Sequence, residues 1–521
     1  MKNLNVIIPM AGHSRRFENQ GFLGPKALLP VGDKTMIEHV FNMFSNANCI
    51  FHIILNQDQV SKDNTVIKFL KSLAPKVFIN IIEPHENGPV YSVLQVSTIN
   101  NEYPVIISYC DFTVAWNFTN FVKDIEGYDG AIPSFKGFHP SSFGETYYAY
   151  MKVDKNSQLL KLKEKESFTE TRVNEPASVG IYYFRSFDVY LYYAKLLLKK
   201  INPKLTEAYV SLIYNLMVDD KLNILVTKVE KFICLGTPSD YEQYQFWHNY
   251  SKKVKVVKKS LHTQSTKQAL IPMAGSGKRF RDNGYKLGKP LIPVNGKPMI
   301  QRAIESLPMQ DKWIFVAKEQ DLQRHKIDNL FSKLTLNFKL IDIYQKTSGQ
   351  ISTCLLAENY IDDRSELFIS SCDYETYYDI YAWNEIIKDK SIDGAVWTTQ
   401  LKGMPVKDPE AFAYCKVMPD QNIIQEIVEK KTISPNPNLD PLVIGTFWFR
   451  KGKDFKIAGK HAIQNDIMVN GEYYIGKSLN HLIQQGKKIV IFEVDQWISF
   501  GDPFELEILN YWVNYFEDIL T

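Results

Sequence analysis

The stretch ALIPMAGSGKRFRDNGYKLGKPLIPVNGKPMI, residues 269–300, decides the fold of this chain. It begins with an apolar run typical of a buried strand and continues into a glycine-rich turn and a charged loop. It ends where apolar residues begin to recur at helical spacing. A strand, a tight turn and a helix in this order are typical of the start of an α/β domain. A similar stretch, VIIPMAGHSRRFENQGFLGPKALLPVGDKTMI, already occupies residues 6–37.

The similarity between the two halves continues along the chain at a nearly constant offset. Three further pairs of segments match in the same order: VIISYCDF (105–112) with LFISSCDY (367–374), SVGIYYFR (178–185) with VIGTFWFR (443–450), and LGTPSDYE (235–242) with FGDPFELE (500–507). Each half is long enough to bury its own core, so the pattern indicates duplication of a whole domain rather than a solenoid. We predict domains at 1–250 and 268–521, joined by a lysine-rich linker at 251–267.

The composition is that of an ordinary globular protein. Of 521 residues, 45% are apolar and 23% are charged, and the formal net charge is only +3, so nothing favours a nucleic-acid partner. The six cysteines are far apart and show no metal-binding or redox spacing. The N-terminal apolar run is too short for a secretory signal, and no apolar stretch is long enough for a membrane helix. We therefore expect a cytoplasmic protein without a membrane partner, and leave a homodimer open.

Strands and helices alternate within each copy. Continuous apolar runs of strand length recur in both halves, and such runs are expected where a parallel sheet is covered by helices on both faces. These runs are FHIILN (51–56), VFINII (77–82), PVIISY (104–109), WIFVAK (313–318), FKLIDIY (338–344) and LFISS (367–371). We predict two tandem Rossmann-like α/β domains of three layers, each with a mixed, mostly parallel sheet.

The glycine-rich turn is suited to phosphate. Small residues after a buried strand let backbone N–H groups approach phosphate oxygens, and here they are Ala274, Gly275, Ser276 and Gly277. A Walker-type loop is excluded because Arg279, rather than Ser or Thr, follows Lys278. A dinucleotide fingerprint lacks its third glycine. The remaining pattern, a phosphate-binding turn followed by Lys278, Arg279 and Lys289, suits a triphosphate that releases pyrophosphate.

An aspartate follows a later buried strand in each copy, Asp373 in the second and Asp111 in the first. A carboxylate at this position could hold a divalent cation on the phosphates, or it could cap the next helix. Its presence in both copies favours the metal role.

The motifs PMAGSGKRF and GKPLIPVNGKPMI, followed in order by CDY, VEKK and IGTFWF, resemble the sugar nucleotidyltransferases, also called nucleoside-diphosphate-sugar pyrophosphorylases. That family and its cytidylyltransferase relatives join a nucleoside triphosphate to a phosphorylated sugar, small alcohol or amide with Mg²⁺ or Mn²⁺, and release pyrophosphate. For the second copy the resemblance implies catalytic roles for Arg279 and Lys289, metal binding by Asp373, nucleotide binding by Gly349 and Gln350 beside the glycine-rich turn, and acceptor binding by Glu429 and Lys430.

The same roles carry over to the first copy with departures. The matching residues are Ala11, Gly12 and Gly88 for the nucleotide, Arg16 and Lys26 for catalysis, Asp111 for the metal, and Glu164 and Lys165 for the acceptor. His13 and Ser14 replace Ser276 and Gly277, and Pro89 replaces Gln350, which removes an amide and a backbone donor.

Both copies also depart from the family near their ends. Cys234 and Ser499 stand where many members carry a second metal-binding aspartate. Asp502 is a substitute in the second copy, whereas the first copy has Thr237 there. The number of metal ions therefore stays open.

Three hypotheses remain. Both copies could catalyse transfer to different acceptors, in a surface-polysaccharide pathway with cytidine as the first guess for the base. Alternatively, the first copy is a non-catalytic regulatory or docking domain. A nucleotide-sugar-dependent glycosyltransferase is the third hypothesis, but those enzymes carry Asp-any-Asp at the metal strand, and this chain has Asp-Phe-Thr at 111–113 and Asp-Tyr-Glu at 373–375.

Overall fold

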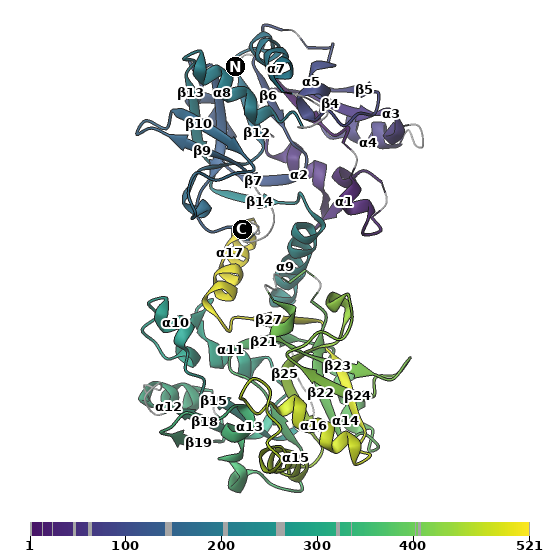
Figure 1. Cartoon of the computed structure of the whole chain (residues 1–521), viewed down its shortest axis with the longest axis vertical. Coiled ribbons are helices and arrows are strands. Elements are labelled where there is room, and N and C mark those ends of the chain that lie inside the picture. The colour runs from purple at the N-terminus through teal and green to yellow at the C-terminus, as the bar shows by residue number, and fades with distance from the viewer. Residues whose placement is uncertain are drawn as a thin grey trace. The chain divides into compact units, whose positions relative to one another are not determined.

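The computed structural model describes residues 3–12, 14–22, 24–44, 48–60, 65–99, 101–140, 148–201, 207–256, 266–318, 324–334, 336–401, 403–404 and 408–519. The chain divides into two compact units, Met1–Gln245 and Phe246–Thr521. In each unit a central sheet is flanked by helices (Figure 1).

The first unit alternates strands and helices as predicted. Its strands are β1 (Leu4–Pro9), β2 (Pro30–Val31), β3 (Lys34–Thr35), β4 (Cys49–Asn56), β5 (Val77–Ile82), β6 (Val105–Ser108), β7 (Phe112–Ala115), β8 (Gly130–Phe135), β9 (Ala149–Val153), β10 (Leu159–Glu164), β11 (Ala177–Ser178), β12 (Ile181–Phe184), β13 (Ile224–Lys228) and β14 (Lys231–Cys234). Its helices are α1 (Arg15–Glu18), α2 (Met36–Asn42), α3 (Gln57–Val60), α4 (Thr65–Ser72), α5 (Pro89–Leu94), α6 (Phe118–Asp124), α7 (Phe187–Lys200), α8 (Ile213–Asp219) and the first part of α9 (Pro238–Val256).

The second unit repeats this order. Its strands are β15 (Thr266–Met273), β16 (Pro293–Val294), β17 (Lys297–Pro298), β18 (Gln310–Lys318), β19 (Phe338–Ile343), β20 (Leu367–Ile369), β21 (Tyr374–Tyr377), β22 (Gly394–Thr399), β23 (Ala413–Val417), β24 (Ile424–Glu429), β25 (Leu442–Phe449), β26 (Ile489–Glu493) and β27 (Gln496–Ser499). Its helices are α10 (Lys278–Asp282), α11 (Met299–Glu305), α12 (Arg324–Lys333), α13 (Gln350–Leu355), α14 (Ile380–Lys388), α15 (Gly452–Gln464), α16 (Ile475–Gln484) and α17 (Pro503–Ile519).

The two central sheets share one topology. In the first unit β5, β4, β1 and β6 lie side by side and are parallel, and β12 then pairs antiparallel with β6 and β8. In the second unit β19, β18, β15 and β20 form the parallel part, and β25 pairs antiparallel with β20 and β22. The predicted mixed α/β sheet is confirmed, and the parallel strands are the apolar runs that the sequence indicated.

Each sheet is buried on both faces. In β15, Ala269, Ile271 and Met273 pack into one apolar core, whereas Leu270 packs into the core on the opposite face. The first strand of the chain does the same, with Val6 and Ile8 in one core and Ile7 in the other. Successive strand residues point to opposite faces, so an unbroken apolar run requires cover on both sides. This gives the three-layer arrangement.

Helix α9 extends into the segment predicted as linker. It begins at Pro238 and ends at Val256, so its last residues overlap the predicted linker at 251–267. Strand β15 begins at Thr266, and residues 257–265 lie outside the described part of the chain. The boundary between the units falls inside α9, after Gln245.

Within the described residues, every helix is too short or too polar to cross a membrane. The cysteines are all free, and all but Cys49 are buried.

Candidate active site

The second unit contains a cavity of about 630 Å³ at the carboxyl ends of its parallel strands. Ligands bind at this edge in α/β folds because the strand-to-helix turns meet there. Residues from distant parts of the sequence line it, including these from the predicted set: Arg279, Gln350, Asp373, Glu429, Lys430 and Asp502. The fold therefore brings these six predicted residues to one cavity, whereas the predicted Lys289 and Gly349 are not among the residues that line it.

A partly buried ion pair joins Asp373, which lines the cavity, to Lys289 behind it. Lys289 Nζ, at the start of a 3₁₀ turn (Lys289–Leu291), donates to Asp373 Oδ2 over 2.5 Å. Burial by itself lowers the pKa of Lys289, but Asp373 outweighs it, and the net pKa is raised. Burial raises the pKa of Asp373, and Lys289 reverses this, leaving a lowered pKa. Both groups are therefore charged at neutral pH.

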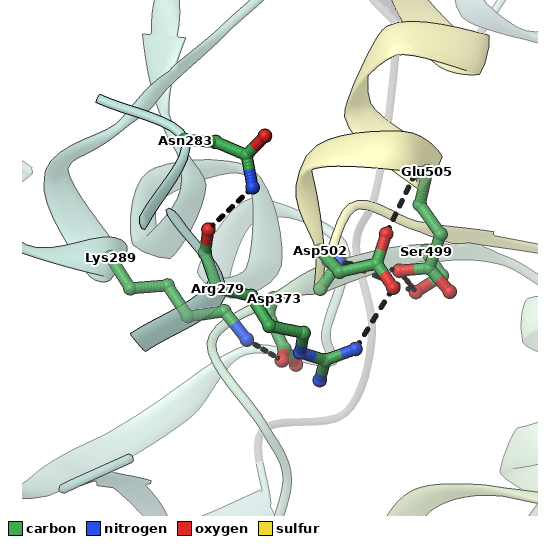
Figure 2. A network of polar contacts seen from close by, with 8 residues as sticks. Arg279, Asn283, Lys289, Asp373, Ser499, Asp502 and Glu505 are labelled. Carbon is green, nitrogen blue, oxygen red and sulfur yellow. Dashed lines mark hydrogen bonds and ion pairs between the residues drawn. The ribbon is translucent and has the colours of Figure 1, made fainter. Parts of the chain in front are cut away.

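Arg279 reaches the cavity from the first turn of α10. Its guanidinium donates a hydrogen bond to Asp502 Oδ2 over 2.9 Å, and the Arg279 side chain is 73% exposed. Figure 2 shows Arg279, Lys289 and Asp373 converging on one region. An exposed guanidinium held by one carboxylate is free to exchange that partner for a phosphate oxygen, because its remaining N–H groups are presented in a planar fork.

A second carboxylate beside Asp502 was missed by the sequence analysis. Glu505 Oε2 accepts hydrogen bonds from Ser499 Oγ (2.7 Å) and from the Asp502 N–H (3.1 Å), and the Glu505 N–H donates to Asp502 Oδ1 over 3.0 Å. This is a capping arrangement at the start of α17. The spacing Asp-x-x-Glu at 502–505 is the signal that predicts it.

The carboxylates gather around Gly501. A Cβ at this position would lie 3.1 Å from Asp373 Oδ2 and 3.3 Å from Glu505 Oε2. The pKa of Glu505 is raised by burial, and repulsion from Asp502 and Asp373 adds to it. Hard oxygen ligands with excess negative charge suit Mg²⁺ or Mn²⁺. Among the described residues, however, no group of three acidic, imidazole or thiol side chains converges closely enough to hold a metal by itself.

The turn at Gly349 and Gln350, which we predict to bind the base of the nucleotide and call the base-side turn, requires glycine. Gly349 has φ 117°, and a Cβ there would lie 2.6 Å from the Tyr473 nitrogen. This close approach to the chain before α16 fixes the start of α13, where Gln350 faces the cavity. Gly88 repeats the feature in the first unit with φ 88° and a distance of 2.7 Å to the Ala208 nitrogen.

Glu429 and Lys430, predicted to bind the acceptor, lie at the end of β24, whose last residue is Glu429. Burial raises the pKa of Glu429 to about 7, despite opposing contributions from Lys430 and Lys477. Lys430 adopts φ 54°, and its ammonium lies 5.4 Å from the centre of the Tyr474 ring. The left-handed backbone at Lys430 turns its side chain to the same cavity as Glu429.

The glycine-rich turn lies beside the cavity rather than in its wall. Ala274 is half-buried, Gly275 and Ser276 are exposed, and Gly277 caps α10 in the left-handed region at φ 58°. Gly275 has open space where a Cβ would stand. An exposed turn of this kind is accessible to a phosphate chain that extends out of the cavity.

The first unit has a smaller cavity of about 450 Å³ at the equivalent edge. It is lined by Ala11, Gly12, Lys26, Gly88 and Asp111 from the predicted set. Lys26 Nζ donates to Asp111 Oδ2 over 2.6 Å, which outweighs burial and raises the pKa of Lys26 to about 12. The lysine–aspartate pair of the second unit is thus repeated.

Other parts of the first cavity differ. Arg15, rather than Arg16, is among the lining residues, and it forms an ion pair with Glu86. Glu164 and Lys165 contact Ser211 and Tyr209 instead of lining the cavity. His13 lies outside the described residues.

The acidic cluster is also reduced in the first unit. Thr237 stands at the position of Asp502, and its hydroxyl donates to Asp240 Oδ2 over 2.7 Å. Asp240 occupies the position of Glu505. The capping arrangement survives there without the second aspartate.

The nucleotidyl transferase family model matches residues 6–245 and 268–513, so the chain belongs to this family and contains its domain twice. The bifunctional protein GlmU of Methanocaldococcus jannaschii is 27% identical over 239 residues, covering 46% of this chain and 52% of that relative. The GlmU of Oceanobacillus iheyensis is 26% identical over 252 residues, covering 46% and 50%. The chain thus spans about half the length of these curated relatives.

Among solved structures, a nucleoside-diphosphate-sugar pyrophosphorylase from Vibrio cholerae RC9 is 21% identical, with 46% of this chain and 99% of that chain covered at a TM-score of 0.38. An inositol-1-phosphate CTP transferase from T. maritima is 14% identical, with 48% and 97% covered at a TM-score of 0.37. The predicted family membership and the α/β nucleotidyltransferase fold are confirmed by the two family matches and the topology.

Proposed function

We propose that the second unit transfers a nucleoside monophosphate from a nucleoside triphosphate to a phosphorylated sugar, small alcohol or amide, and releases pyrophosphate. The observation that carries this proposal is the Lys289–Asp373 ion pair, whose aspartate lines one cavity together with Arg279. Two cations and a carboxylate at the carboxyl edge of a parallel sheet suit the charge of a triphosphate.

The reaction follows from the charges. An oxygen of the acceptor phosphate attacks the α-phosphorus, and the bond between that phosphorus and the bridging oxygen to the β-phosphate breaks. The bonding electron pair leaves with pyrophosphate. Arg279 and Lys289 neutralise the negative charge that develops on this leaving group. The acceptor phosphate is ionised near pH 7, so no general base is needed, and positioning with charge neutralisation supplies the acceleration.

Asp373 and Asp502 would hold a divalent cation, with Glu505 orienting Asp502 through the capping hydrogen bonds. The approach of the Asp373 and Glu505 carboxylates to each other around Gly501 is the observation that fits a cation here. When bound, Mg²⁺ or Mn²⁺ supplies charge neutralisation on the triphosphate oxygens.

A non-catalytic role for the first unit is the second candidate. Pro89 removes a backbone donor at the base-side turn, Arg15 is paired with Glu86, and Thr237 replaces the second aspartate. The unit keeps the Lys26–Asp111 pair, so in this second proposal it binds a nucleotide without catalysing the transfer.

A screen of triphosphates against phosphorylated acceptors, followed through pyrophosphate release by the full-length chain, tests the proposal. Release that needs both substrates and Mg²⁺ supports it, and the most active pair identifies base and acceptor; cytidine and a surface-polysaccharide precursor are our first expectations. Absence of release with every pair contradicts the proposal. Transfer of sugar from a nucleotide-sugar would instead support the glycosyltransferase alternative.

A further inference from the structure

Helix α9 begins in the first copy and continues beyond its end into the second unit. Up to Gln245 it packs in the first unit, where Tyr241 Oη and Gln245 Nε2 donate to the Pro30 carbonyl over 2.8 Å and 2.5 Å. From Phe246 onward the helix belongs to the second unit. The family match to the first copy likewise ends at residue 245.

The second part of α9 is anchored by a buried polar network. Tyr250 Oη donates to Glu375 Oε1 over 2.7 Å and accepts from Arg302 over 2.9 Å. Arg302 also donates twice to Glu375, over 2.9 Å and 2.8 Å. The three side chains are only 3%, 8% and 5% exposed for Tyr250, Arg302 and Glu375. A fully hydrogen-bonded network in a low-dielectric interior holds its side chains in one geometry.

The residues that hold this part of α9 lie on β21 and β27, the two strands next to the acidic cluster. Glu375 lies on β21, which starts directly after Asp373, and Gln496 of β27 donates to the Phe246 carbonyl over 2.9 Å. Strands β21 and β27 pair with each other, and β27 ends at Ser499. The position of α9 is thus coupled to both strands from which the acidic cluster extends.

Phe246 and Trp247, the first residues of this anchored part, line the cavity of the second unit. Trp247 is 4% exposed, and its ring packs edge-on against Tyr250 at 5.5 Å. Phe412 and Trp497 line the same cavity and pack against each other at 6.1 Å. The cavity therefore combines aromatic side chains with the ionic groups Arg279, Asp373 and Asp502.

We propose that Phe246 and Trp247 are acceptor-specificity residues of the second unit, so that its transfer reaction uses a wall supplied by the part of α9 that belongs to this unit. The inference rests on the proposed function. The ionic side of the cavity handles the triphosphate, and the aromatic side, which includes Phe412 near Glu429 and Lys430, receives the non-phosphate part of the acceptor. Aromatic rings of this kind select an acceptor whose carbon skeleton presents a C–H face, such as a ring.

The first unit lacks the anchor. His39 and Thr113 occupy the positions of Arg302 and Glu375 in the repeat, and the His39 ring nitrogen contacts the Val31 carbonyl over 2.9 Å. No aromatic residue from α9 is among the residues that line the first cavity. The proposed wall therefore distinguishes the two copies.

Kinetics of the full-length protein test the inference, with glucose 1-phosphate, inositol 1-phosphate and glycerol 3-phosphate as acceptor probes. Phe246→Ala and Trp247→Ala should each raise the KM of a ring acceptor about tenfold or more, the scale of apolar pocket contacts. The KM for the triphosphate should change by less than about twofold, since these residues act on one substrate only. Trp247→Phe should restore most of the loss.

Tyr192→Ala is the matched control, because this aromatic side chain is 62% exposed in the first unit and lines neither cavity. It should leave both KM values unchanged. Phe246 is only half-buried, so Phe246→Ala keeps the test decisive if the Trp247→Ala protein does not fold.

The outcomes separate the two claims. An inactive wild-type protein with all probes contradicts the proposed function and the inference together. An active wild type whose acceptor KM is unchanged by Phe246→Ala, or whose two KM values rise equally, contradicts the inference alone.

Discussion

Lys289 and Asp373 form a 2.5 Å ion pair in the second unit although 83 residues separate them in the chain, and Lys26 and Asp111 repeat the pair at 2.6 Å in the first. The repeat therefore preserved the central charge pair while the surrounding side chains diverged. Matched substitutions of the two lysines therefore compare the contributions of the two copies to turnover.

Lys289→Ala should lower the rate of pyrophosphate release by about 100-fold or more, as expected for loss of a preorganised cation. Lys26→Ala is the matched change in the first unit and should reduce the total rate far less. Pyrophosphate release under saturating substrates measures both. Equal losses in the two variants would support two catalytic copies and contradict a non-catalytic first unit.

Two glycines should respond differently to alanine. Gly349→Ala places a Cβ 2.6 Å from the Tyr473 nitrogen at φ 117°, so we expect a loss of about 2 kcal/mol or more in unfolding free energy. Gly275→Ala meets open space and should leave stability within about 0.5 kcal/mol. Because Gly275 belongs to the predicted phosphate-binding turn, its variant should bind the triphosphate more weakly. Urea unfolding and equilibrium binding of the triphosphate measure the two effects.

Glu429 should make stability depend on pH. Burial raises its pKa from the ordinary 4.5 to about 7 in the folded protein. Between these values the folded state binds the proton more tightly than the unfolded state, so this group's contribution to stability falls as pH rises through that interval. Glu429→Gln should remove this contribution. Unfolding free energies at pH 5 and pH 8 should then differ less in the variant, and an identical pH dependence would contradict the prediction.

The Arg302–Glu375 pair should be costly to break from one side. Glu375→Ala leaves a buried guanidinium without its carboxylate, and we expect a loss of about 3–5 kcal/mol in unfolding free energy. The exposed Lys416–Glu426 pair, 2.8 Å apart, is the control, and Glu426→Ala should cost at most about 1 kcal/mol. Similar losses of unfolding free energy for both pairs in urea titrations would contradict the prediction that burial of Arg302 makes its pair costly to break.

The sequence predicted those features that depend on local pattern or on the repeat. The apolar runs gave the parallel strands, and the repeated lysine and aspartate indicated a shared site without showing that they pair. The sequence analysis chose Arg16 by its match to Arg279, whereas Arg15 lines the cavity. Adjacent residues on a short helix point in different directions, and only the packing of α1 decides which one faces the cavity.

Contacts over long distances explain what the sequence analysis missed. The lysine-rich segment after Tyr250 lacks a sustained apolar period, so it resembled a linker. The helix continues through Val256 in a region where Tyr250 is held by Arg302 and Glu375. Glu505 is the exception, because its contacts with Asp502 are local and the Asp-x-x-Glu spacing at 502–505 indicates them.

We propose that Asp373 holds the divalent cation of a triphosphate in the second cavity. The most direct test is pyrophosphate release by Asp373→Asn, measured over a range of Mg²⁺ concentrations with the wild type alongside. We expect a fall in maximal rate of about 100-fold and a higher Mg²⁺ concentration for half-maximal rate. An unchanged maximal rate and an unchanged Mg²⁺ requirement would contradict it.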